Sequence, residues 1–166
     1  MGGNPIWAAV EHVPAPITRL ANVAAVLPIP GDPPGLVGER IFATPNSHFI
    51  GTTVPGPEDG TTVISAAGAR AAFYNTRPPS AAERALARLR PQLTGVIGTP
   101  IPLSGANCGR VPKRYVLCLC GQAIPARIQR RMCGRVPEIT VVEMDCDHSP
   151  FYSDPQGLAR VLVSDR

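Results

Sequence analysis

The sequence contains few aromatic residues and almost no lysine. Phe, Trp and Tyr make up 5% of the chain, and Lys113 is the only lysine among 16 basic residues. The arginines are scattered, and only Arg127, Arg130 and Arg131 form a cluster. Nucleic-acid-binding surfaces usually combine a basic stripe with aromatic residues that stack on bases. We therefore expect no nucleic-acid partner, despite the net charge of +4.

Long apolar runs are also missing. No stretch approaches the roughly 20 residues that a membrane-spanning helix needs, and the first residues show no signal-peptide pattern. The chain has five cysteines, so one would stay unpaired in any disulfide scheme. We expect a cytoplasmic protein with reduced thiols and no membrane association. The segment Cys118-Leu119-Cys120 lacks the second ligand pair of a zinc site, so we expect no metal and no cofactor.

Hydrophobic residues make up 44% of the 166 residues, which is enough for the core of one domain. Their spacing predicts helices and strands that alternate along the chain, as in an α/β fold with a parallel sheet. The predicted elements are a helix at 1–13, strands at 17–27, 115–119 and 139–144, and helices that begin at Ser80 (with a capping box), at Pro125 and after Asp154. Residues 43–72 are rich in Gly, Pro, Thr and Ala, and the sequence predicts no element there.

Functional residues of a parallel sheet gather at the carboxyl ends of its strands. The predicted loops at that edge are 28–35, 120–124 and 145–151. Of the three histidines, only His148 falls in one of them, because His12 ends a helix and His48 lies in an unassigned segment. His148 is therefore a candidate catalytic residue. The alternative is that His148 has no catalytic role and is a loop residue that hydrogen-bonds Asp145 or Asp147.

The segment Asp147-His148-Ser149-Pro150-Phe151 resembles the histidine loop of the α/β-hydrolases. The resemblance is closest to the branch that contains plant methylesterases, hydroxynitrile lyases and bacterial esterases. Further matches follow in the family's order over nearly all of the chain. Residues 17–28 resemble the strand after the nucleophile helix, 73–75 and 85–92 resemble the cap, and Ala123-Ile124-Pro125 resembles the loop that carries the catalytic acid.

The resemblance implies a single incomplete α/β-hydrolase domain over residues 1–166. Its fold would be C-terminal parallel strands with flanking helices and a mostly helical cap insert. The nucleophile helix and the strand after it would occupy 1–35, the cap-like insert 36–98, and the C-terminal strands and helices 99–166.

The resemblance also assigns roles to individual residues. His148 would be the general base that activates a serine in a Gly-x-Ser-x-Gly turn. The chain opens Met1-Gly2-Gly3, which corresponds to the residues after that serine, so we expect the nucleophile to be missing. Met1 would occupy the position whose backbone amide contributes to the oxyanion hole.

The catalytic acid is a second departure from the family pattern. The family places an aspartate just before the Ala-Ile-Pro segment, and Gly121 occupies that position here. Glycine has no side chain that could orient an imidazole. Asp32, after the first predicted strand, is a candidate substitute acid, although its neighbours Gly31 and Pro33 are typical of an ordinary turn.

The resemblance implies a parent activity of carboxylic ester hydrolysis by a serine, histidine and acid mechanism, with a small ester or apolar molecule as ligand. We expect residues 1–166 to be inactive alone. The alternative is a non-catalytic remnant or a small-molecule-binding α/β-hydrolase-like protein. A hydroxynitrile lyase ranks below both, because it needs cap residues that we cannot identify. We also expect self-association through an unpaired sheet edge beside 17–27.

Overall fold

A parallel three-stranded sheet forms the centre of the fold. The computed structural model describes residues 2–29, 52–95 and 99–164. The sheet has the order β1-β5-β6, with β1 at Leu20–Val23, β5 at Lys113–Cys118 and β6 at Ile139–Met144. Lys113 lies opposite both Leu20 and Ile139, and the pairing with β6 continues to Cys118 opposite Met144. Every residue of β5 is buried, as expected for the central strand of a parallel sheet. The three predicted strands are confirmed.

The first strand is shorter than the sequence predicts. The apolar run at 17–27 indicated one long strand, but regular pairing ends at Val23. Ala24 follows with φ of 42°, in the left-handed region where the strand cannot continue. The Ala24 amide still donates to the Val116 carbonyl at 3.0 Å. Leu27 is fully buried outside any strand, so its hydrophobicity reflects packing against the core rather than strand pairing.

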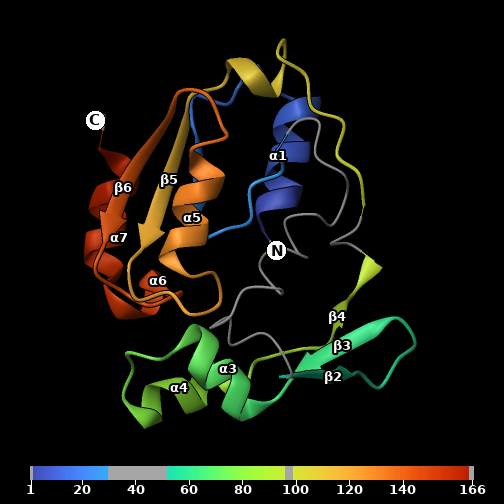
Figure 1. The fold of residues 1–166 in the computed structure, drawn as a ribbon, viewed down its shortest axis with the longest axis vertical. Helices are drawn as coiled ribbons and strands as arrows, with labels where there is room; N and C mark the ends of the chain where they lie inside the picture. The colour runs from blue at the N-terminus through green and yellow to red at the C-terminus, as the bar shows by residue number, and fades with distance from the viewer. Residues whose placement is uncertain (1, 30–51, 96–98, 165–166) are drawn as a thin grey trace.

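Helices cover both faces of the sheet (Figure 1). Helices α1 (Gly3–His12) and α5 (Ala126–Cys133) pack on one face, where Trp7 and Ile128 share a core with Tyr115 and Leu117 of β5. Helix α7 (Pro155–Val163) packs on the other face, against Val116 and Cys118. The alternation of inward side chains along β5 therefore divides the core into two layers.

The last helix begins as predicted. The Asp154 side chain accepts a hydrogen bond from the Gly157 amide at 2.8 Å, and Pro155 lies in the first turn. Leu158 is buried, and Val161 packs beside it. Leu162 does not share this inward face, because the residue is 38% exposed.

The insert contains a small antiparallel sheet that the sequence does not predict. Its order is β2-β3-β4, with β2 at Thr53–Pro55, β3 at Thr61–Ile64 and β4 at Gln92–Leu93. These strands are short, and β2 and β4 are exposed along their whole length. They therefore lack the apolar alternation that identifies a half-buried strand.

Two helices complete the insert. Helix α3 (Ala66–Phe73) was not predicted, and α4 (Pro79–Leu86) was. The predicted capping box of α4 is wrong, because the helix starts at Pro79 and no side chain caps it. Ala82 and Ala85 are buried and form the inward face of α4. Two further short helices were not predicted. Helix η2 (Cys108–Arg110) lies in a segment without a predicted element, and α6 (Pro150–Ser153) begins within the predicted loop 145–151.

None of the helices in the described part of the chain is long and apolar enough to cross a membrane.

Candidate active site

The candidate site lies where β5 and β6 end. Both strands point toward α6, and α3 of the insert lies beyond their carboxyl ends (Figure 1). The loop after β5 contains Gly121, and the loop after β6 contains His148. The structure thus brings these two predicted site positions to the same edge of the sheet, as parallel strand order requires.

His148 lies against the insert rather than in open solvent. Its ring is 5.3 Å, centroid to centroid, from the ring of Phe73, the last residue of α3. The Nδ1 atom is buried and has no hydrogen-bond partner among the residues that the structure describes. Burial disfavours the charged imidazolium and lowers the pKa of His148 to about 4, although the carboxylate of Asp147 acts in the opposite direction. The imidazole is therefore neutral at neutral pH.

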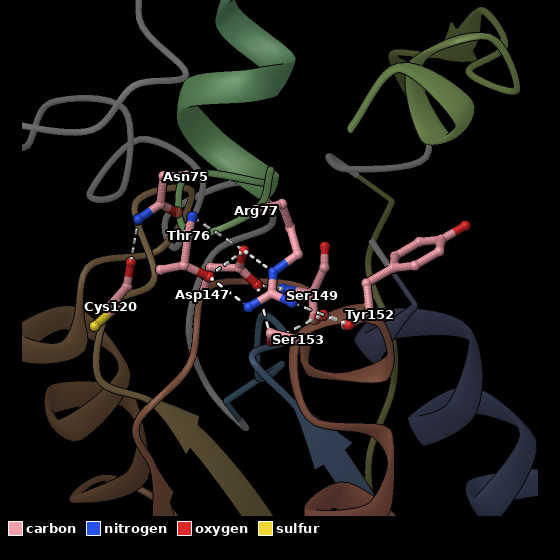
Figure 2. A network of polar contacts seen from close by, with 8 residues as sticks. All are labelled: Asn75, Thr76, Arg77, Cys120, Asp147, Ser149, Tyr152 and Ser153. Carbon is pink, nitrogen blue, oxygen red and sulfur yellow. Dashed lines mark hydrogen bonds and ion pairs between the residues drawn. The ribbon is translucent and has the colours of Figure 1, made fainter. Parts of the chain in front are cut away.

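The carboxylate of Asp147 is fully buried and does not serve as a partner for His148 Nδ1. One of its oxygens, Oδ1, accepts hydrogen bonds from the Ser149 amide at 3.0 Å and from the Ser153 hydroxyl at 3.1 Å. The other, Oδ2, accepts from the Thr76 hydroxyl at 2.8 Å and the Thr76 amide at 3.3 Å, and lies 3.9 Å from Arg77 Nε. Figure 2 shows these contacts converging from the insert and from α6. Asp147 therefore shapes the loop that carries His148, and no hydrogen bond joins it to His148 Nδ1.

Gly121 leaves little room for the missing acid. A Cβ atom there would lie 3.1 Å from both the Cys118 carbonyl oxygen and Gln129 Nε2, and 3.3 Å from the Ile124 carbonyl oxygen. Gln129 is fully buried and holds this loop. Its Nε2 donates to the Cys118 and Ile124 carbonyls at 3.0 and 2.7 Å, and its Oε1 accepts from the Cys118 amide at 3.1 Å. The loop at Gly121, where the family places its catalytic acid, is therefore held by the side-chain amide of Gln129 from α5.

Met1, the predicted oxyanion-hole position, and Asp32, the candidate substitute acid, both lie outside the described residues. Asp145, the remaining carboxylate of the histidine loop, is exposed and accepts a contact from Cys120 Sγ at 3.3 Å.

The cysteines in the structure are free thiols rather than disulfides. Burial raises the pKa of Cys118, Cys133 and Cys146, and the value for Cys133 is about 11. Such thiols stay protonated at neutral pH and are therefore poor metal ligands. Over residues 2–29, 52–95 and 99–164, no group of three or more His, Cys, Asp or Glu side chains could hold a metal ion.

Sequence reasoning missed the insert residues that contact the histidine loop. Residues 73–75 were recognised as part of a cap, but Thr76 and Arg77 were not singled out. Their partner Asp147 is 71 residues away from Thr76 in the sequence. The sequence carries no local signal for these contacts, because a buried carboxylate can take its donors from any part of the chain.

The parallel sheet, the helices on both faces and the histidine loop at the carboxyl edge together define an α/β-hydrolase fold. Comparison with known proteins agrees. The model of the alpha/beta hydrolase family matches residues 1–161, and the chain belongs to this family.

Relatives with curated functions include esterases. Methylesterase 7 from Arabidopsis thaliana is 28% identical over 169 residues, with 98% of this chain and 65% of the relative covered. The pyrethroid hydrolase from Sphingobium wenxiniae is 29% identical over 168 residues, with 98% and 60% covered. The chain thus spans 60–65% of the length of these two relatives.

Solved structures show the same fold. Polyneuridine aldehyde esterase has a TM-score of 0.84 at 20% identity, over 98% of this chain and 67% of that one. A pyrethroid hydrolase from Sphingobium faniae has a TM-score of 0.80 at 26% identity, over 97% and 65%.

Proposed function

We propose that the protein serves carboxylic ester hydrolysis through an acyl-enzyme, with His148 as the general base. The observation that carries the proposal is the place of His148. It lies on the loop after β6, at the carboxyl edge of a parallel sheet and against the insert, in a chain of the alpha/beta hydrolase family. The esterases among its relatives support the choice of ester substrates.

The proposed chemistry needs a neutral imidazole. A serine oxygen attacks the acyl carbon while its proton passes to Nε2 of His148. The imidazolium then gives this proton to the oxygen of the leaving alcohol, and water repeats the sequence to release the acid. With a pKa of about 4, His148 is neutral at neutral pH, so its free ring nitrogen can accept a proton, although burial makes it a weaker base than an ordinary histidine.

We further propose that residues 1–166 do not complete this machinery alone. The family resemblance assigns the serine to a position outside these residues. Gly121 offers no carboxylate, and within the part of the chain that the structure covers, His148 Nδ1 has no partner that could orient the ring. The same observations favour one alternative, a non-catalytic protein of hydrolase fold that binds a small apolar molecule.

Hydrolysis of short p-nitrophenyl esters by residues 1–166 tests the incompleteness directly. We expect the rate to equal the buffer background, and to be the same for His148→Ala and for the surface control His12→Ala. Turnover above background that disappears only in His148→Ala would overturn the incompleteness and establish that these residues are a sufficient enzyme.

A further inference from the structure

The loops after β5 and β6 are both held by one short segment of the insert. This segment, Asn75 to Arg77, follows helix α3 and is here named the 75–77 turn. Asn75 Nδ2 donates to the Cys120 carbonyl at 3.0 Å, in the loop after β5. Arg77 Nη1 donates to the Tyr152 carbonyl at 3.4 Å, beyond the loop after β6. Just before the turn, the Ala72 carbonyl accepts from the Ala123 amide at 3.1 Å.

The strongest part of this connection passes through Asp147. Its Oδ1 is used inside the histidine loop, where the bond to the Ser149 amide spans His148 and fixes the backbone on both sides of it. Its Oδ2 faces the 75–77 turn and takes both hydrogen bonds from Thr76. The carboxylate is therefore shared between the segment that carries the histidine and the segment that covers it (Figure 2).

A buried carboxylate needs all of these donors. Asp147 has no exposed surface, and the charge of Arg77 lies 3.9 Å away without a hydrogen bond to it. Hydrogen bonds to an ionised group are stronger than neutral ones, and an unmet buried charge is costly. If the Thr76 hydroxyl were lost, Oδ2 would keep only the longer amide bond, and the loop would open toward water to satisfy it.

We propose that Thr76, assisted by Arg77, is a positioning residue for His148, because its hydrogen bonds to Asp147 hold the histidine loop against the insert. The inference rests on the proposed function in one respect, that His148 is the general base. The hydrogen bonds between Thr76 and Asp147 lie among the described residues, and their effect on the histidine loop can be measured without any turnover.

The test compares Thr76→Val, which removes the hydroxyl at nearly constant volume, with Thr76→Ser, which keeps it. The readout is the midpoint of His148 protonation, followed by NMR of the imidazole Cε1–H group between pH 3 and 8. Signals of the other two histidines are assigned with His12→Gln and His48→Gln. Hydrogen exchange of peptides that cover 118–125 and 145–153 is the second readout.

In Thr76→Val we expect the His148 midpoint to rise toward the ordinary value for histidine by about one pH unit or more, because the imidazole becomes hydrated. Exchange in both peptides should become faster, by roughly tenfold, since local opening costs less. Thr76→Ser should behave as the parent protein. Thr94→Val is the matched control, because Thr94 Oγ1 donates to the Gly60 carbonyl at 2.9 Å in the distant antiparallel sheet.

The proposal is overturned if Thr76→Val leaves the midpoint and the exchange rates unchanged, or if Thr76→Ser or Thr94→Val moves them equally. If Thr76→Val did not fold, Arg77→Met would decide, with a smaller shift in the same direction expected and no shift contradicting the proposal. Neither readout depends on ester cleavage. If turnover in a chain supplied with a nucleophile survived in His148→Ala, the proposed function would be refuted, whereas a shift in Thr76→Val would still support the positioning of His148 by Thr76.

Discussion

Glu11, near the end of α1, joins this helix to the segment before β5. Its carboxylate accepts hydrogen bonds from the Ser104 hydroxyl at 2.6 Å, the Ser104 amide at 2.9 Å and the Cys108 amide at 3.1 Å. These bonds favour the ionised form, and those from Ser104 contribute most to lowering the pKa of Glu11 from 4.5 to about 2. The unfolded chain therefore takes up this proton at a higher pH than the folded chain does.

This difference predicts part of the acid sensitivity of the protein. The stabilisation from Glu11 is complete above about pH 4.5 and is lost as the pH falls toward about 2. In Glu11→Gln, the urea midpoint should depend less on pH over this interval than in the parent. Glu83→Gln, which changes an exposed glutamate of α4, serves as the control. Equal pH slopes for Glu11→Gln and the parent would contradict the assignment.

Single residues were the hardest level to predict from sequence. His148 was found because its motif is local, and Asp154 because helix caps have a local pattern. Lys113 had no such signal. It is buried over the Trp7 ring, and its Nζ donates to the carbonyls of Cys108, Gly109 and Val111 at 2.8 to 3.0 Å. A lysine is expected on the surface unless the fold supplies acceptors, and the sequence does not show where the fold does so.

Helix α1 can approach the segment after β1 only because Gly3 lacks a side chain. A Cβ atom at Gly3 would lie well inside contact distance of the Val26 carbonyl oxygen. A Cβ atom at Gly2, one position earlier, would have no other atom within 4 Å. Two adjacent glycines therefore differ completely in what the fold demands of them.

Substitutions of Gly3 and Gly2 by alanine test this close packing of α1. Gly3→Ala should lower the free energy of unfolding by about 2 kcal/mol or more, because the helix or the backbone at Val26 must move. Gly2→Ala should stay within about 0.5 kcal/mol of the parent. Urea unfolding followed by circular dichroism measures both changes. Equal effects of the two substitutions would show that α1 does not pack as closely as the structure indicates.

Elements of the main sheet were predictable, whereas in the insert only helix α4 was. Strand β5 is an apolar run that is buried throughout, and α5 and α7 have clear apolar faces, so their local patterns match their environments. Strand β6 has an apolar sequence although Thr140, Val141 and Glu143 are exposed. Strands β2 and β4 have exposed side chains, and the buried positions of α3 are small residues, Gly68, Ala69 and Ala72. Because these elements bury no large apolar residues, their sequence shows no periodic hydrophobic pattern.

At the scale of the whole molecule, the parallel sheet presents β1 at one edge. Within the described residues β1 has β5 as its neighbour on one side only. The amides of Leu20 and Ala24 donate toward β5, so the alternation of a strand directs the Ala21 amide to the free side. Unpaired strand edges invite pairing with another chain.

We therefore propose that the protein self-associates through β1, with a second copy as partner. Sedimentation velocity should show concentration-dependent association. Ala21→Pro should weaken it, because proline removes the outward donor while the bonds to β5 remain. Ala21→Ser keeps the donor and should associate as the parent does. A monomer at every concentration, or equal association of the two variants, would contradict the proposal.

The most direct test of the central claim concerns His148 in a chain supplied with a nucleophile. Residues 1–166 would be extended at the amino end by the corresponding segment of the Sphingobium wenxiniae pyrethroid hydrolase, and kcat/KM for p-nitrophenyl butyrate would be measured. We predict turnover in the extended, folded protein and a loss of about 10²-fold in His148→Ala, with His12→Ala unchanged, because Gly121 supplies no acid and losses within one triad are not additive. Turnover that survives in His148→Ala would contradict the assignment of His148 as the general base.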